Sequence, residues 1–259
     1  MDRRDFIKKT AAAAATVAIA TPVTAMLKKA ESTGLVDEEA EPAQMSRPDG
    51  KPQKVLLVNG SPRRDGNTFC CLQEIEKQLQ EHGVLTEIVQ IGPRTVNMCI
   101  NCGGCKQNGG DGCVFTDDVC ADITEKMKES DALIVGTPVY YGQPNGGILS
   151  LMQRLFYSAG HLVQNKPAAA VAVCRRGGAT ATLQTMNMMF EMMNMPVVSS
   201  QYWNIAYGAG KGEVKLDKEG MQTMRTLATN MAWLLEKIHA NGNPDYPKRE
   251  PWQGMKFIR

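Results

Sequence analysis

The stretch KVLLVNGSPRRDGNT, residues 54–68, decides the fold. Its apolar run 55–58 is typical of a buried strand, because valine and leucine follow one another without a polar interruption. Apolar residues then recur every three or four positions from Phe69 to Leu79, which predicts an amphipathic helix that ends at His82-Gly83. Between the two, the chain is predicted to form a loop that leaves a strand and opens a helix.

Such a loop is a natural anion site, because it presents backbone N–H groups and the positive end of the helix dipole. Gly60 and Gly66 permit tight turns, and Ser61, Asn67 and Thr68 supply hydroxyl and amide donors for phosphate oxygens. The loop is neither a GxGxxG dinucleotide fingerprint nor a GxxxxGK[ST] loop, since no lysine follows the second glycine. The alternative is an ordinary turn in which Asn67 or Thr68 only caps the helix.

The rest of the chain alternates short apolar runs with amphipathic stretches, as βα units around a parallel sheet do. Further strands are predicted at 84–91, 132–136, 168–173 and 197–202. Apolar residues at helical spacing from Met221 to Ile238 predict a long last helix that Asn241-Gly242 closes. The sequence therefore predicts an α/β fold with a doubly wound five-stranded parallel sheet, order 2-1-3-4-5, and helices on both faces.

The first 25 residues have the pattern of a removable export signal. Arg3-Arg4 precedes the alanine-rich stretch 11–20 and the small-residue site Val23-Thr24-Ala25, which predicts twin-arginine export to the periplasm. An amphipathic helix or a membrane anchor is the alternative, but the apolar stretch is too short to cross a bilayer. Domains are predicted as a signal at 1–25, a flexible linker at 26–53, a folded domain at 54–240 and a C-terminal tail at 241–259.

Composition argues against two classes of function. With 43% hydrophobic residues among 259, the chain can bury one substantial core. Removal of the signal would leave 25 basic and 25 acidic residues, so the mature chain lacks the basic surplus of a nucleic-acid-binding protein. No other segment is apolar for long enough to form a stable membrane span.

Several motifs carry a resemblance to a known family. They are GSPRRDGNT at 60–68, a cysteine-rich insert at 97–116, TPVYYG at 137–142, RRGGA at 175–179, MPVV at 195–198, YWN at 202–204 and FIR at 257–259. In this order they resemble the flavodoxin-like NADPH-dependent FMN reductase and iron-sulfur flavoprotein family over about residues 54–259. Agreement among several ordered motifs is more specific than any one of them.

The resemblance implies that FMN binds in the crevice at the carboxyl ends of the strands. The segment 138–142 would bring backbone groups and tyrosine rings to the isoalloxazine, and the arginines at 175–176 would stabilise the anionic reduced ring. For one residue of each tyrosine and arginine pair, packing or solvation is the expected role, since chain neighbours point different ways. The implied cofactor-binding residues are Ser61, Arg63, Asn67, Thr68, Pro138, Val139, Tyr140, Tyr141, Gly142, Arg175, Arg176 and Gly177.

Four of the eight cysteines fall at Cys99-x2-Cys102-x2-Cys105-x7-Cys113 in a glycine-rich stretch. Such spacing lets thiolates converge on one small inorganic centre, although Val114 rather than proline follows the fourth cysteine, unlike a ferredoxin run. The resemblance implies a [4Fe–4S] cluster ligated by these four residues. Disulfides or free thiols in an oxidising compartment are the first alternative, and a zinc site is the second.

Together these features predict an exported FMN-dependent oxidoreductase that passes electrons through flavin and a cluster. The resemblance implies a homodimer or homotetramer and reduced nicotinamide, NAD(P)H, as electron donor. Export would place the chain where no free nicotinamide pool is expected, so a quinol, a cytochrome or a membrane-bound reductase is the alternative donor, with a small molecule or a protein as acceptor. The rival functions are a non-enzymatic flavodoxin-type electron carrier, against which the neutral charge counts, and a cluster-free flavoprotein with disulfides.

Overall fold

The computed structural model describes residues 44–47, 49–240, 246–248, 250–251 and 253–254. The predicted signal at 1–25, the linker up to residue 43 and most of the predicted tail lie outside the described residues. Among the helices that are described, none is both long enough and apolar enough to cross a membrane.

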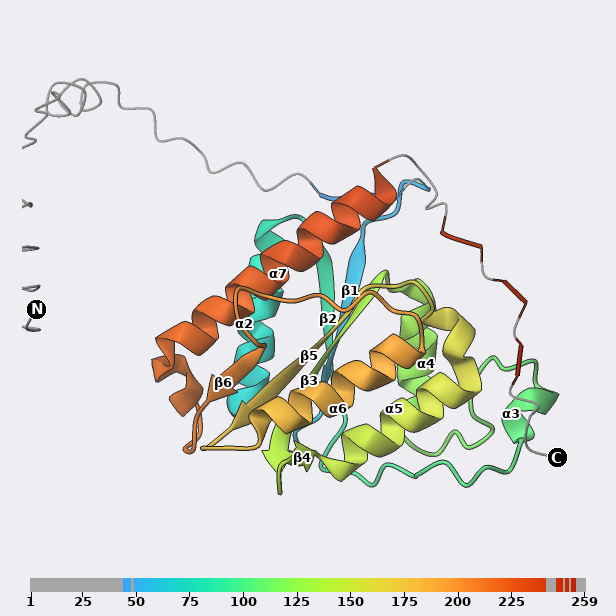
Figure 1. Cartoon of the computed structure of the whole chain (residues 1–259), viewed down its shortest axis with the longest axis horizontal. Helices are drawn as coiled ribbons and strands as arrows, with labels where there is room; N and C mark the ends of the chain where they lie inside the picture. The colour runs from blue at the N-terminus through green and yellow to red at the C-terminus, as the bar shows by residue number, and fades with distance from the viewer. Residues whose placement is uncertain (1–43, 48, 241–245, 249, 252, 255–259) are drawn as a thin grey trace, which may run out of the picture. The chain divides into compact units, whose positions relative to one another are not determined.

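A parallel sheet forms the centre of the domain (Figure 1). Its strand order is β2-β1-β3-β5-β6, and β4 pairs antiparallel with β3 outside this path. This confirms the predicted doubly wound order for the five parallel strands. The strands are β1 (Lys54–Asn59), β2 (Leu85–Gln90), β3 (Ala132–Tyr140), β4 (Gln143–Pro144), β5 (Ala168–Cys174) and β6 (Ile205–Tyr207).

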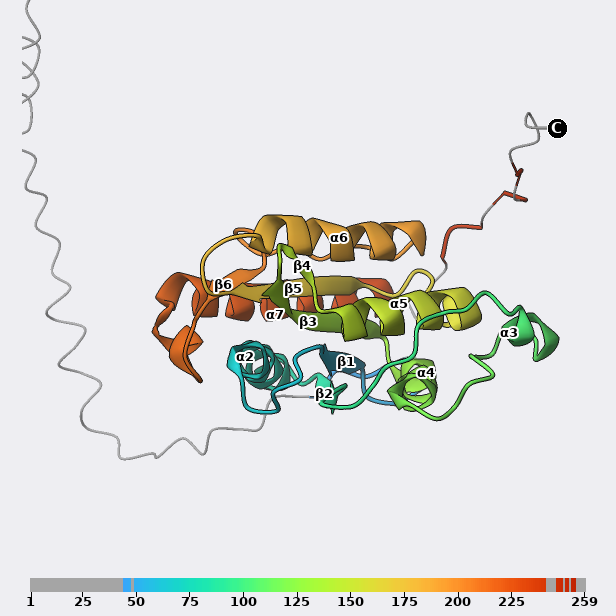
Figure 2. The same ribbon diagram turned by 90° about the horizontal axis from the view of Figure 1, so that it is seen from below.

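Helices cover both faces of the sheet, because alternate strand residues point to opposite sides. In β1, Leu56 and Val58 pack into one core, whereas Val55 and Leu57 pack into the other. The first core is closed by α4 (Val119–Glu129), α5 (Gly146–Ala159) and α6 (Ala179–Met192), and the second by α2 (Asn67–Glu81) and α7 (Lys218–His239). Figure 2 shows the same layers from below, with the short helix α3 (Gly104–Gln107) at the edge of the domain.

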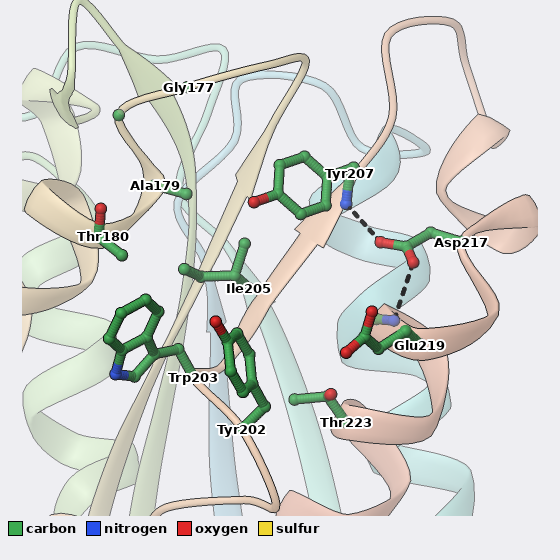
Figure 3. A pocket seen from close by; sticks show the side chains of 12 residues that line it. Gly177, Ala179, Thr180, Tyr202, Trp203, Ile205, Tyr207, Asp217, Glu219 and Thr223 are labelled. Carbon is green, nitrogen blue, oxygen red and sulfur yellow. Dashed lines mark hydrogen bonds between the residues drawn. The ribbon is translucent and has the colours of Figure 1, made fainter. Parts of the chain in front are cut away.

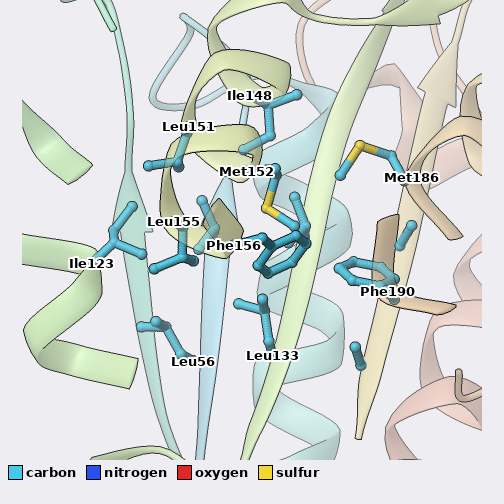
Figure 4. Close-up of a cluster of buried hydrophobic side chains, with 14 of the residues drawn as sticks. Leu56, Ile123, Leu133, Ile148, Leu151, Met152, Leu155, Phe156, Met186 and Phe190 are labelled. Atoms are coloured by element: carbon cyan, nitrogen blue, oxygen red, sulfur yellow. The ribbon is translucent and has the colours of Figure 1, made fainter. Parts of the chain in front are cut away.

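The core between α5 and α6 holds α5 firmly in place. Phe156 of α5 meets Phe190 of α6 edge to face, with ring centroids 6.2 Å apart. Leu133 and Met152 lie beside them, fully or almost fully buried (Figure 4). Full burial of each such side chain stabilises the fold by about 1.5–3 kcal/mol. Helix α5 is therefore a rigid support for the loops that contact it.

The prediction for the fifth strand is wrong in position. Residues 197–202 were expected to form it, but Val197 makes only an isolated bridge to Ala168, and the strand is β6. The segment crosses the start of β5, and pairing resumes where Ala172 N–H donates to Asn204 O at 3.0 Å. The two valines at 197–198 therefore indicated a strand too early, and the strand that forms, β6, has three residues.

The last part of the predicted linker packs on the domain. Met45 N–H donates to Gly83 O at 2.9 Å, and Gln53 N–H donates to Met45 O at 2.7 Å. Arg47 Nε forms an ion pair with Asp131 at 2.9 Å. The folded unit therefore begins before Lys54, with residues 44–47 and 49–53 forming an N-terminal strap. The short elements η2 (Gly160–Leu162) and η3 (Glu213–Leu216) complete the described structure.

Candidate functional site

The loop after β1 leaves the N-terminus of α2 open. Ser61 N–H donates to Asn59 Oδ1 at 3.1 Å, and Arg63 N–H donates to Ser61 Oγ at 3.1 Å, so the loop is shaped by its own polar groups. Gly66 occupies the N-cap position, and no described side chain caps this helix. The first N–H groups of α2, together with its dipole, are therefore available to an anion.

The loop after β6 forms a second wall against this opening. Asn67 Nδ2 donates to Gly210 O at 2.9 Å, and Asn67 Oδ1 accepts from Val214 N–H at 3.3 Å. Asp65 pairs with Lys211, and this hydrogen bond is the main reason why the pKa of Asp65 is lowered. The Asn67 side-chain amide, predicted to donate to phosphate, thus holds the two loops together.

Strand β3 runs past the sheet and returns as β4 through a two-residue turn. The two turn residues have positive φ, +52° at Tyr141 and +75° at Gly142, which is the type I′ hairpin geometry. Tyr140 pairs with Gln143 at the base of the turn. The hairpin leaves Tyr141 fully exposed and Tyr140 about half exposed.

Gly178 joins this hairpin to the loop after β5. It is the N-cap of α6 with φ +85°, and a Cβ at this position would lie 2.7 Å from Gly142 Cα. Only glycine tolerates both the left-handed backbone and the close approach. The predicted flavin segments 138–142 and 175–177 are consequently packed side by side.

A cavity of about 170 Å³, called here the strand-end cavity, opens where these loops meet. It lies at the carboxyl ends of β1, β3 and β5, where a doubly wound sheet binds its ligand. Of the predicted flavin-binding residues, eight line it: Ser61, Arg63, Asn67, Thr68, Pro138, Val139, Tyr140 and Arg175.

The other predicted flavin-binding residues lie outside the strand-end cavity. Tyr141 extends into solvent, Gly142 packs against Gly178, and Arg176 is exposed. Gly177 lines a neighbouring pocket. Each predicted pair therefore contributes one lining residue and one outside residue, as expected for chain neighbours that point different ways.

Sequence reasoning missed part of the cavity wall. Gly66, Val173, Cys174, Gly208 and Ala209 also line the strand-end cavity. The last two follow β6, whose position was mispredicted, and the signal for them is the glycine-rich run GAGKG at 208–212 after a short apolar run. Burial raises the pKa of the Cys174 thiol, which keeps it protonated at neutral pH.

The neighbouring pocket, about 180 Å³, is rich in aromatic side chains and is called here the aromatic pocket. Tyr202 and Trp203 have ring centroids 5.2 Å apart, and Tyr207 stands across from them (Figure 3). All three rings are about half exposed. The pocket reaches Gly177, so it adjoins the loop after β5.

The charge of the aromatic pocket is negative. Asp217 accepts from Tyr207 N–H at 2.8 Å and from Gly220 N–H at 2.9 Å, so its carboxylate is occupied in capping α7. Glu219 is exposed at the same end of α7 and lines the pocket (Figure 3). No lysine or arginine is among the described residues that line it.

The four clustered cysteines line one small cavity of about 20 Å³, the cysteine cavity. Cys105, on α3, is buried, Cys113 is half-buried, and Cys99 and Cys102 are exposed. All eight cysteines lie within the described residues and are free thiols. No three ligand-type side chains in the described part of the chain stand close enough to hold a metal ion. The insert thus gathers four thiols in one place without closing them into a coordination shell.

One buried arginine holds both ends of the insert. Arg154 of α5 is 1% exposed and pairs with Asp118. It also donates to Asn97 O at 3.3 Å and to Phe115 O at 2.7 Å. Asp118 accepts in turn from Asn97 N–H at 2.8 Å and from Cys120 N–H at 3.0 Å. Both ends of the cysteine insert, near Asn97 and Phe115, are therefore bonded to the Arg154–Asp118 ion pair, which joins α5 to the start of α4.

Two further contacts fix the insert on α5. Tyr157 OH donates to Asn101 Oδ1 at 3.2 Å, and Gly112 N–H donates to Ser158 O at 3.2 Å. Burial by itself lowers the pKa of Arg154, but the neighbouring Cys113 and the ion pair with Asp118 raise it above its usual value. The guanidinium is therefore permanently charged beside the cysteine cavity.

Comparison with known proteins identifies the family of the chain. The family model described as NADPH-dependent FMN reductase matches residues 53–210. The chain is 35% identical over 193 residues to an iron-sulfur flavoprotein of Methanocaldococcus jannaschii, covering 71% of this chain and 98% of that protein. It is 31% identical over 194 residues to an iron-sulfur flavoprotein of Methanosarcina thermophila, covering 73% and 98% respectively.

Solved structures resemble the chain in fold. RosB, solved with a bound 8-demethyl-8-formylriboflavin-5'-phosphate intermediate, has a TM-score of 0.56 at 17% identity, over 80% of this chain and 94% of RosB. A WrbA-like flavodoxin from Agrobacterium tumefaciens has a TM-score of 0.52 at 15% identity, over 72% and 99%. At these identities the likeness shows a flavodoxin-like fold.

Proposed function

This chain belongs to the NADPH-dependent FMN reductase family and is an FMN-dependent oxidoreductase, and we propose that its FMN binds at the strand-end cavity. The observation that carries this placement is the convergence of three segments on one cavity: the open N-terminus of α2, the β3–β4 hairpin and the arginine-bearing loop after β5. When bound, FMN supplies a centre that exchanges two electrons at N5.

Different residues that line the strand-end cavity would bind different parts of FMN. The N–H groups at the start of α2 and the Ser61 and Thr68 side chains bind the phosphate, with Arg63 as a counter-charge. Val139 and Tyr140 supply an apolar wall at the end of β3. Arg175, which also lines the cavity, would place a positive charge near the flavin ring and would so favour its reduction.

The placement is tested by purifying the protein without oxygen and measuring FMN per chain in two matched variants. Arg175 and Arg176 are both exposed, but only Arg175 lines the cavity, so Arg175→Gln removes a charge from the cavity and Arg176→Gln removes the same charge from outside it. We expect the first to lower FMN affinity and the flavin midpoint potential and the second to leave both near the unmutated values. A protein that purifies without FMN and does not bind it would refute the function, and equal effects of the two variants would refute the placement.

A [4Fe–4S] cluster is proposed for the four-cysteine insert, in line with the name of the relatives. The donor set fits in kind, since thiolates are the usual ligands of such clusters. It also fits in place, since the four thiols line one cavity and the buried Arg154 Nε beside it has no partner in the described residues. The loop must rearrange to bring the four thiols into coordination, which its glycines and its two exposed cysteines allow. When bound, the cluster supplies single-electron exchange.

Iron and acid-labile sulfide per chain test this proposal. Cys113→Ser removes a thiol of the cysteine cavity, and Cys120→Ala removes a thiol from the buried interior of α4, where burial raises its pKa to about 11. We expect Cys113→Ser to lose iron and Cys120→Ala to retain it. Zinc in place of iron, or disulfides found by mass mapping after anaerobic purification, would support the alternatives instead.

The aromatic pocket is proposed as the place where a small-molecule electron partner stacks, because it adjoins Gly177 and presents three half-exposed rings. Its free charge is the Glu219 carboxylate, which repels the phosphates of NADPH. A neutral planar donor such as a quinol suits it better.

Steady-state reduction by NADPH and by a soluble quinol tests this proposal. Trp203→Ala removes a ring of the pocket, and Trp233→Ala removes a similarly exposed ring on α7 outside it. We expect quinol turnover to fall only in the first variant. Fast NADPH turnover that Trp203→Ala leaves unchanged would contradict the proposal.

Export and self-association complete the proposal. The Arg3-Arg4 motif supports transport by the twin-arginine route to the periplasm, and cofactor insertion before export is the reason for using a route that carries folded proteins. An Arg3→Lys, Arg4→Lys double variant should accumulate in the cytoplasm with its signal uncleaved. Light scattering of the mature protein should give a homodimer or homotetramer. A monomer, or export of the double variant, would contradict these points.

A further inference from the structure

Arg154, which holds both ends of the cysteine insert, is a buried guanidinium beneath a largely exposed loop. Burying a charge is costly unless its hydrogen-bonding groups find partners. The two terminal nitrogens of Arg154 have theirs: Asp118, Asn97 O and Phe115 O. Arg154 Nε is buried and has no partner among the described residues.

The residue that carries the orphaned donor is part of the wall of the cysteine cavity. Arg154 lines that cavity together with all four clustered cysteines. Cys113, one of these cysteines, is a half-buried free thiol. A buried N–H without an acceptor is rare in folded proteins, and one beside a cavity points to a missing ligand.

We propose that Arg154 Nε–H donates to the thiolate of Cys113 when the insert holds its cluster, and that Arg154 thereby sets the reduction potential of that cluster. The inference rests on the cluster proposed above. A hydrogen bond and a positive charge at a ligating sulfur stabilise the more negative, reduced form, so Arg154 raises the potential. Asp118 opposes it with the negative charge of its carboxylate. Arg154 is in this sense a positioning residue.

Two variants separate this role from a merely structural one. Arg154→Lys keeps a positive charge for Asp118 but has no donor at the Nε position. Asp118→Asn removes the opposing charge; its single amide oxygen can still cap α4 through Cys120 N–H, whereas the contact that the second carboxylate oxygen makes with Arg154 is lost. A loosened loop would move the potential of both variants in the same direction, whereas the proposed role moves them in opposite directions.

The experiment measures iron per chain, FMN per chain and the cluster midpoint potential by redox titration followed by electron paramagnetic resonance. We expect Arg154→Lys to decrease the equilibrium constant of cluster reduction by up to about tenfold, which is 59 mV for a one-electron couple, and Asp118→Asn to increase it. FMN content should stay unchanged in both.

The outcomes distinguish this inference from the proposed function. An unmutated protein without iron ends both the cluster proposal and the inference. Iron in the unmutated protein, with an unchanged potential or shifts of one sign in the variants, overturns the inference alone. If Arg154→Lys takes up no iron, the Asp118→Asn potential decides: a rise supports the inference, and no change or a fall overturns it.

Discussion

Replacement of Gly178 by alanine is the sharpest test of how the proposed flavin site is assembled. The residue has φ +85°, and its added Cβ would lie 2.7 Å from Gly142 Cα, a backbone atom that has no rotamer with which to move aside. Two penalties therefore add. One comes from the left-handed backbone and the other from the clash.

The magnitudes follow from each penalty in turn. A left-handed alanine costs about 1–2 kcal/mol, of which the smaller entropy of the unfolded alanine chain returns about 0.4–1 kcal/mol. Overpacking against backbone adds about 1–3 kcal/mol. We expect Gly178→Ala to lower the free energy of unfolding by about 1–5 kcal/mol.

Two neighbouring glycines provide matched controls. Gly142→Ala also has a positive φ, +75°, but its Cβ would meet open space, so only the first penalty applies, about 1 kcal/mol. Gly177→Ala has neither feature and should stay within about 0.5 kcal/mol. Denaturant unfolding of the FMN-free variants, followed by circular dichroism, measures all three.

The same series tests the flavin site. If the clash in Gly178→Ala is relieved by separating the hairpin from the loop after β5, FMN affinity falls at least about tenfold, since 1.4 kcal/mol is a factor of ten. Fluorescence titration of FMN gives this number. Equal stability of Gly178→Ala and Gly142→Ala would show that the two loops are not in rigid contact and would refute the reasoning.

Three further outcomes follow from the described contacts. Asn67→Asp keeps the acceptor for Val214 N–H but loses the donor to Gly210 O and brings a negative charge to the start of α2. Its FMN affinity, measured by equilibrium dialysis, should fall at least about tenfold. The FMN affinity of Asn67→Ala, which adds no charge, should fall less. Burial lowers the pKa of Lys166 from 10.5 to about 8, so the unfolded chain binds this proton more tightly than the folded chain does. The free energy of unfolding should therefore rise by at most about 3 kcal/mol as the pH rises from 8 to 10.5. Lys166→Met should lack that rise. Arg47→Ala breaks the part-buried pair that anchors the N-terminal strap and should cost about 1–3 kcal/mol in thermal unfolding, whereas Lys51→Ala, which breaks an exposed pair, should cost less than about 0.5 kcal/mol.

The sheet and much of the candidate site could be predicted from sequence because each rests on a local pattern. The run at 55–58 is apolar at every position, as a strand covered on both faces must be, and the loop after it is bounded by glycines. Since parallel strands end at one edge of the sheet, segments that follow three predicted strands were expected to meet there. They do meet, at the strand-end cavity.

What sequence missed depends on contacts between distant residues. Strand β6 has three residues, and its place is set by pairing with the end of β5, which no local run of side chains reveals. Arg154 looks like a helix-surface residue in the sequence, yet its partners Asn97, Phe115 and Asp118 lie 36–57 positions away. Only the fold shows that the insert closes on this residue.

Helix α5 connects the two proposed sites. At its N-terminus, Asn145 N–H donates to Thr137 Oγ1 at 3.0 Å, at the base of the β3–β4 hairpin. Arg154 follows nine residues later, which is roughly 14 Å along a helix. Between them Ile148 and Leu151 are fully buried, so the helix cannot slide without breaking the core. Because one packed element sets the distance between the hairpin and the cysteine cavity, this spacing belongs to the fold of a single chain, and loop variants can change either site without changing it.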